Sequence, residues 1–230
     1  LRRQRQMCIR DRCKRGAVTG SVGKTSVTRA VEAGLRLAGK AHASVKSYNN
    51  HIGVPLTLAR MPRDTQRAVF EIGMNHADEI TPLSKFVRPH AVAITTVGPV
   101  HLENFENEEG VARAKAEIFD GLEPGGIAVL NADNAWFDLL KAQAEKAGAT
   151  VWSFGEAAGA TARLTGFAVE GEGATVSVEL RGEAIDFPIR QTGVHWGPNS
   201  LCVLLMLEAL DVSRETALAA LAAFAPIEGR

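Results

Sequence analysis

The stretch VTGSVGKTS, residues 18–26, decides how the fold of this chain is read. A short apolar run, residues 17–19, leads into a glycine turn. A helical pattern follows, with one apolar face, and Gly39 is a natural place for it to end. This strand–turn–helix order is the context that a phosphate-binding loop requires.

The residue types within the stretch support the same interpretation. Gly20 and Gly23 would let backbone N–H groups converge on phosphate oxygens, where the helix N-terminus adds positive potential. Lys24 would reach the terminal phosphates and the Thr25 hydroxyl would bind Mg²⁺. The complete pattern has a glycine where this chain has Val18, so a purely structural glycine turn is the alternative.

Beyond the loop, short β-type runs alternate with helical patterns. The expected strands are 67–74, 90–97, 126–131 and 150–154, and the expected helices lie near 76–86, 107–120 and 134–147. This alternation predicts an α/β fold with a mostly parallel P-loop-type sheet and helices on both faces. In such a sheet, ligands bind beyond the carboxyl ends of the strands.

The last third of the chain has a different pattern. Residues 160–192 contain three strand-like pieces separated by Gly-rich turns, which predict a small antiparallel appendage. Two closing helices are expected, one from near Pro198 to about Leu210 and one starting at Ser213.

Residues 1–15 carry seven of the 26 Lys/Arg residues but only one of the 26 Asp/Glu residues, and they have no apolar period. A nucleic-acid arm and a targeting peptide are possible, but the apolar core of a secretory signal is missing. QMCIRDR, residues 6–12, resembles translated sequencing-adapter sequence. We therefore interpret 1–15 as a non-native basic extension and 16–230 as the domain, and we expect residues 1–14 to be disordered or packed without register.

Composition excludes several classes of protein. The net charge is zero, so it gives no argument for a nucleic-acid partner. The longest apolar run, residues 201–207, is far too short to span a bilayer. Outside residues 1–15 only Cys202 remains, which excludes a disulfide framework and favours a reduced, cytoplasmic setting.

Two charged residues occupy apolar positions. Glu71 lies within a predicted strand, where it would either form a salt bridge or face the phosphates and hold Mg²⁺. Lys115 lies on the apolar stripe of its helix, opposite a solvated face on which Arg113 and Glu117 are expected to pair. Its ammonium would either extend into water or have a lowered pKa that suits reaction with CO₂.

Several segments resemble the Mur ligase family. VTGSVGKTS is similar to its version of the phosphate loop, in which the first glycine is usually absent. Four further segments resemble signatures of the branch that adds D-alanyl-D-alanine: SYNNHIGVPLTL (47–58), EIGMNHADEI (71–80), ITTVGPVHLENF (94–105) and RAKAEIF (113–119). The resemblance covers 16–230, and Asp78 stands where the family usually has glycine.

The resemblance implies a role for individual residues. Nucleotide binding is assigned to Gly20, Ser21, Gly23, Lys24, Thr25, Ser26, His195, Asn199 and Arg230. Magnesium binding is assigned to Thr25, Glu71, His101 and Lys115, the lysine as its carbamate. Catalysis is assigned to Lys24, His101 and Lys115, and contact with the precursor to Asn49, Asn50, Asn75 and His76.

The residues alone leave other interpretations open for some of these positions. His101 could be an ordinary surface or core histidine. Asn49, Asn50 and His51 could form a turn or a helix cap, and Asn199 could simply occupy the first turn of its helix.

As a member of this family, the chain would be the central ATP-binding domain, without the N-terminal and C-terminal domains. With ATP and Mg²⁺ as cofactors, it would serve a monomeric enzyme that joins D-alanyl-D-alanine to a UDP-linked muramoyl tripeptide through an acyl phosphate. The alternatives are another Mur or folylpolyglutamate-type ligase, a P-loop ATPase module without ligase activity, and a non-enzymatic nucleotide-binding module.

Overall fold

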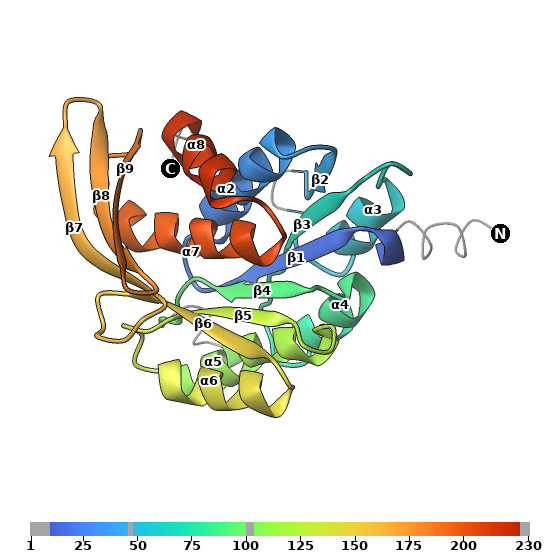
Figure 1. The fold of residues 1–230 in the computed structure, drawn as a ribbon. Helices are drawn as coiled ribbons and strands as arrows, with labels where there is room; N and C mark the ends of the chain where they lie inside the picture. Colours follow the sequence, from blue (N-terminus) through green and yellow to red (C-terminus); the bar gives the residue numbers. More distant parts are fainter. Residues whose placement is uncertain (1–9, 46–47, 100–103, 226–230) are drawn as a thin grey trace.

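The computed structural model describes residues 10–45, 48–99 and 104–225, and within them the strands form one nine-stranded sheet (Figure 1). In chain order these strands are β1 Lys14–Thr19, β2 Ala41–Ala43, β3 Arg67–Glu71, β4 Ala91–Ile94, β5 Ile127–Asn131, β6 Thr150–Gly155, β7 Ala162–Glu170, β8 Gly173–Leu180 and β9 Glu183–Ile189. Across the sheet the order is β2-β3-β1-β4-β5-β6-β7-β8-β9. The crossovers of the first six strands are those of a doubly wound sheet.

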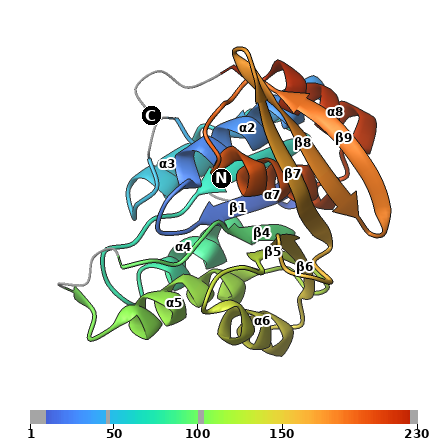
Figure 2. The ribbon, with the colours of Figure 1, turned by 90° about the vertical axis from the view of Figure 1, so that its left-hand side faces the viewer.

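The sheet has a parallel and an antiparallel part. Strands β1 to β6 pair in parallel, and β7 also pairs in parallel with the end of β6. Antiparallel pairing begins only between β7 and β8 and continues to β9. The predicted antiparallel appendage is therefore continuous with the main sheet, and it stands beside helix α7, Trp196–Ala209 (Figure 2).

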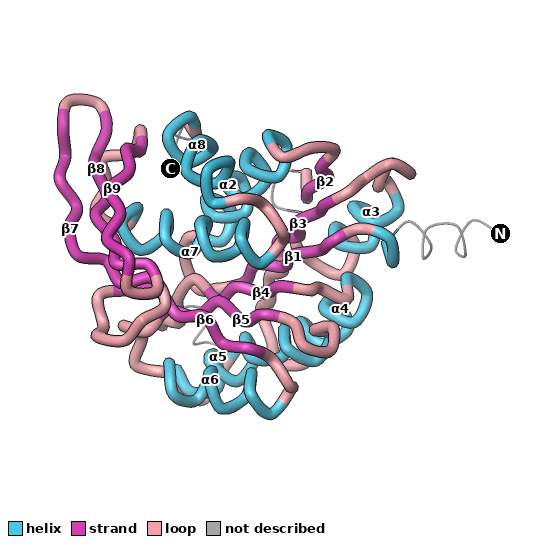
Figure 3. The backbone as a smooth tube through the Cα atoms, in the orientation of Figure 1, coloured by secondary structure: helices cyan, strands magenta, loops and turns pink. Residues whose placement is uncertain are grey.

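Helices cover both faces of the sheet, as predicted (Figure 3). Helices α2 Lys24–Leu37, α7 and α8 Arg214–Ala223 share one apolar core with the sheet. The opposite core contains α3 Gly53–Ala59, α4 Ile80–Val87, α5 Glu108–Ala116, the 3₁₀ turn η2 Glu117–Gly121 and α6 Phe137–Lys146. Of the helices in the described ranges, none combines the length and the apolar character needed to cross a bilayer.

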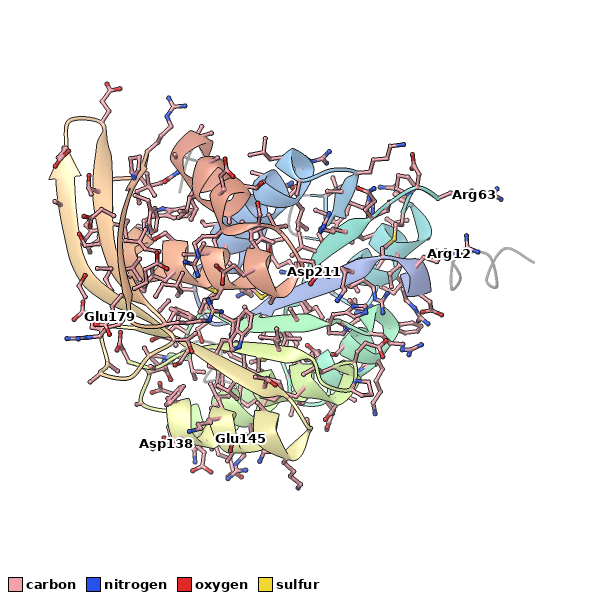
Figure 4. All side chains as sticks on the ribbon, viewed as in Figure 1. Arg12, Arg63, Asp138, Glu145, Glu179 and Asp211 are labelled. Atoms are coloured by element: carbon pink, nitrogen blue, oxygen red, sulfur yellow. The ribbon has the colours of Figure 1, made fainter. Side chains whose placement is uncertain are left out.

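Charge lies mainly on the outside of this arrangement. The side chains of Arg12, Arg63, Asp138, Glu145 and Glu179 are exposed and point away from the ribbon (Figure 4). The buried charged residues are few, and they require specific partners because burial disfavours an unpaired charge.

The boundary expected at residue 16 is wrong for the fold. Strand β1 begins at Lys14, and Cys13 and Arg15 are both buried. Arg15 can lie in a strand because Glu123 pairs with it at 3.1 Å and the Arg88 carbonyl accepts from its Nε at 2.8 Å. The expected lack of register is thus wrong for residues 10–14, whereas 1–9 lie outside the described residues.

Candidate functional site

The phosphate-type loop joins β1 to α2, and its two glycines have conformations that favour glycine. Gly20 has φ 148° and Gly23 has φ 86°. A Cβ atom on Gly20 would lie 2.0 Å from Thr95 Oγ1, so the loop also approaches the end of β4 too closely for a side chain. Gly20 is therefore required by both conformation and space, and Gly23 by conformation.

The loop opens into a cavity of about 700 Å³ at the carboxyl end of the sheet. Its lining residues are Ser21, Val22, Gly23, Lys24, Thr25, Ser26, Thr95, Thr96, Asn131, His195, Pro198 and Asn199. This cavity therefore contains the loop together with His195 and Asn199, two residues at the N-terminal end of α7 that the resemblance assigns to the nucleotide. The sequence does not single out Thr95, Thr96 and Asn131, although their positions agree with the rule that ligands bind beyond the strand ends.

The loop is held by the segment that follows β4. Ser21 N–H donates to the Thr96 carbonyl at 2.8 Å, and Thr95 Oγ1 donates to the Val22 carbonyl at 2.5 Å. Lys24 Nζ donates to the Gly20 carbonyl at 2.6 Å, so its ammonium lies over the loop. Backbone N–H groups, a helix N-terminus and an ammonium together form an anion-binding site.

A second cavity of about 300 Å³ adjoins the first. It is lined by Lys24, Asn49, Asn50, His51, Gly73, Met74, Asn75, Glu79 and Leu83. Three of the residues expected to contact the precursor therefore share one cavity, whereas His76 lies outside this lining. Lys24 lines both cavities.

Two of these asparagines form hydrogen bonds within the protein. Asn50 Oδ1 accepts from the N–H groups of Ile52 at 3.2 Å and Gly53 at 2.9 Å, which supports the turn-or-cap interpretation for this residue. Asn49 Nδ2 instead donates to Glu71 Oε1 at 2.7 Å and links the second cavity to β3.

Glu71 fits a metal site. It is the last residue of β3 and only 1% exposed, and its Oε2 is buried without a hydrogen-bond partner among the described residues. No salt bridge to Glu71 occurs in the described part of the chain, which leaves its charge without the cation that the structural interpretation required. A buried, unpartnered carboxylate oxygen near a phosphate loop is a suitable ligand for Mg²⁺.

Lys115 is 2% exposed, so the interpretation in which its ammonium extends into water is wrong. Burial, and to a smaller extent the positive charge of Lys24, lowers the pKa of Lys115 to about 7. Burial of Lys115 near the Lys24 ammonium favours the neutral amine, which is the form that reacts with CO₂.

The expected pair of Arg113 with Glu117 is wrong. Arg113 pairs with Glu109 at 2.6 Å, because the α-helix ends at Ala116 and the 3₁₀ turn redirects Glu117. The Glu117 carboxylate accepts from the N–H groups of Asp78 at 2.6 Å, Ile80 at 3.0 Å and Thr81 at 3.1 Å. It thereby caps α4, which has no side-chain cap of its own.

Asp78 adopts φ 64°, a left-handed conformation that explains why glycine would suit this position. Two assigned residues, His101 and Arg230, lie outside the described residues. Within the described ranges, no group of three His, Cys, Asp or Glu side chains forms a ready-made metal site.

Comparison with known proteins shows the class to which this architecture belongs. The Mur ligase middle domain family matches residues 18–207, and the chain belongs to that family. UDP-N-acetylmuramoyl-tripeptide–D-alanyl-D-alanine ligases from Rickettsia prowazekii and Escherichia coli are each 34% identical over 215 residues. Each match covers 93% of this chain but 48% and 47% of those proteins, so the chain spans about half their length.

Solved structures agree with this classification. MurF from Acinetobacter baumannii has a TM-score of 0.92 at 28% identity, covering all of this chain and 50% of that one. MurF ligase from Thermotoga maritima, solved in complex with ADP, has a TM-score of 0.83 at 20% identity, covering 100% of this chain and 53% of that one. The second likeness concerns the fold alone.

Proposed function

We propose that this chain is the ATP-binding part of a ligase that joins D-alanyl-D-alanine to a UDP-N-acetylmuramoyl tripeptide. The observation that carries the proposal is the position of Lys24 between the loop cavity and the asparagine-lined cavity. That position suits transfer of the γ-phosphoryl group of ATP to a carboxylate. The names of the relatives supply the substrate class.

The chemistry needs positioning and charge neutralisation more than a protein nucleophile. The N–H groups of the loop and the α2 N-terminus would bind the phosphates, and Lys24 would balance the charge of the transferred group. His195 and Asn199 would contact the adenosine end, where they line the same cavity. Asn49, Asn50 and Asn75 would orient the carboxylate. His76, outside that lining, keeps the precursor contact that the family resemblance gives it. The resulting acyl phosphate would be attacked by the amine of the dipeptide, releasing phosphate.

The same proposal includes Mg²⁺. Bound to Thr25 and Glu71, it would neutralise the phosphates during transfer. Lys115 would take part as a carbamate, an anion made from its neutral amine and CO₂. His101 and Arg230 keep the roles that the family resemblance gives them, as a further magnesium ligand and a phosphate contact.

We further propose a cytoplasmic, monomeric enzyme that acts on small molecules rather than on nucleic acid. Its substrates, a nucleotide-linked sugar peptide and a dipeptide, require no membrane-spanning part in this chain. Since the chain spans about half of its relatives, we expect it to bind ATP with Mg²⁺ without completing the ligation by itself.

A chimaera tests the proposed substrates. This chain would replace the matching part of the Escherichia coli ligase, and formation of the pentapeptide product from ATP, tripeptide precursor and D-alanyl-D-alanine would be measured. Product formation that is lost in Lys24→Ala supports the proposal. A folded chimaera that binds ATP but joins a different amino acid, or only hydrolyses ATP, contradicts it.

A further inference from the structure

Asn134 does not line the loop cavity, but it binds the segment after β4 whose residues Thr95 and Thr96 do. Its Nδ2 donates to the Val97 carbonyl at 2.8 Å and to Thr96 Oγ1 at 3.1 Å. Its Oδ1 accepts from Trp136 N–H at 3.0 Å and thereby fixes the turn that leads into α6. The amide nitrogen and the amide oxygen of Asn134 therefore both have hydrogen-bond partners, and these partners fix the orientation of the side chain.

The segment that Asn134 holds is the one that holds the phosphate loop. The Thr96 carbonyl accepts from Ser21 N–H at 2.8 Å, and Ser21 Oγ exchanges hydrogen bonds with the N–H and carbonyl of Gly98 at 2.9 and 3.1 Å. A shift of residues 95–98 would therefore move the loop N–H groups that are expected to bind phosphate.

Asn134 is itself anchored from the far side. The neighbouring Asp133 accepts from Glu156 N–H at 2.7 Å and from Ala157 N–H at 2.8 Å, both just after β6. Hydrogen bonds thus join the loops after β6, β5 and β4 to the phosphate loop, in the order in which the strands lie in the sheet. Such a chain of bonds can keep an anion site in its binding geometry before the ligand arrives.

We propose that Asn134 is a positioning residue for the phosphate loop and sets the affinity for the phosphates of the nucleotide without touching them. This inference rests on the proposed function, because it assumes that the loop binds nucleotide phosphates. Loss of the Asn134 amide donor frees residues 95–98, so part of the binding free energy is then spent on ordering the loop.

The test uses Asn134→Ser in the chain as it is. The serine hydroxyl can still accept from Trp136 N–H in the same kind of turn, but it is too short to reach Val97. Asn107→Ser is the matched control, since Asn107 begins α5 by accepting from Gly110 N–H at 3.0 Å and serine is an equally good cap.

Two quantities are measured: the Kd of Mg²⁺-ADP by calorimetry and the hydrogen-exchange rate of the Ser21 amide. We expect Asn134→Ser to raise the Kd about tenfold, the equivalent of one or two hydrogen bonds, and to speed exchange at Ser21. Exchange in α7 should stay unchanged, and Asn107→Ser should change neither quantity.

An unchanged Kd or unchanged exchange at Ser21 would overturn the inference. So would faster exchange throughout the sheet and α7, because that result assigns Asn134 to general stability. If the unmodified chain binds no Mg²⁺-ADP, the proposed function fails, whereas exchange at Ser21 still decides whether Asn134 holds the loop. Should Asn134→Ser not fold, Asn134→Asp loses the same donor and can be compared at high salt, where its added charge is screened.

Discussion

Lys115→Met should make the protein more stable, and by an amount that depends on pH. The lysine is 2% exposed and its pKa is lowered to about 7, whereas in the unfolded chain it returns to its ordinary value of 10.5. Between these two values the unfolded chain binds the proton more tightly than the folded chain does. Folding therefore opposes protonation, and the lysine lowers the free energy of unfolding throughout that range. Methionine has a similar shape without the charge.

The sign and size follow from linkage. A depressed lysine pKa gives a stability that is complete above pH 10.5 and falls as the pH drops toward 7. From these two pKa values, the wild-type free energy of unfolding should rise by about 2.5 kcal/mol relative to Lys115→Met between pH 7.5 and about 9.5. At pH 7.5 the variant should be more stable by roughly 2–4 kcal/mol, allowing for imperfect packing of methionine.

Urea unfolding of both proteins at several pH values measures this difference. The buffers must be free of CO₂, because carbamate formation would replace the amine. Lys40→Met is the matched control, since it removes an ammonium that is exposed and pairs with Asp64. A difference between wild type and Lys115→Met that is constant with pH would refute a buried lysine with a lowered pKa.

Three further substitutions test the packing and capping around the site. Gly34→Ala places a Cβ 2.5 Å from Leu207 Cδ1 between α2 and α7, so we expect thermal unfolding to show a net loss of about 1–2 kcal/mol despite better helix propensity. Ser213→Ala removes the oxygen that accepts from Thr216 N–H at the start of α8 and should cost about 1 kcal/mol in the same assay; no loss would mean that water replaces the cap. Glu117→Ala leaves three N–H groups of the α4 start without an acceptor and should cost about 2–3 kcal/mol in urea unfolding, whereas Glu109→Ala on the exposed face should cost less than about 1 kcal/mol. Equal losses in the last two would contradict the capping role.

The features that the sequence predicts well are those with a strong local signal. Strands β3 to β6 and helices α2, α7 and α8 follow from apolar periodicity, and the glycine loop follows from its spacing. Lys115 stands out because its neighbours on the helix are apolar. Strand β2 has only three residues, Ala41–Ala43, which is too short to form a period. Helix α3 begins at a glycine and contains Pro55, which hides it among turn signals.

The missed features depend on contacts between distant residues. α-Helical spacing predicts Glu117 on a solvated face, but the turn changes to 3₁₀ at that residue. The adapter-like character of residues 6–12 places Arg15 outside the expected domain, but Glu123, far along the chain, compensates its charge within the sheet. Thr95, Thr96 and Asn131 line the cavity because β4 and β5 end beside the loop, and sequence order does not reveal strand order.

Calorimetric titration of the chain with Mg²⁺-ATP tests the central claim most directly. We predict one bound ATP per chain, an affinity that falls by at least about tenfold in Lys24→Ala because a charge-assisted contact to phosphate is lost, and no change in Lys40→Ala. Absence of binding by the unmodified chain, or equal affinity in Lys24→Ala, would contradict the assignment of this loop and its cavity to ATP.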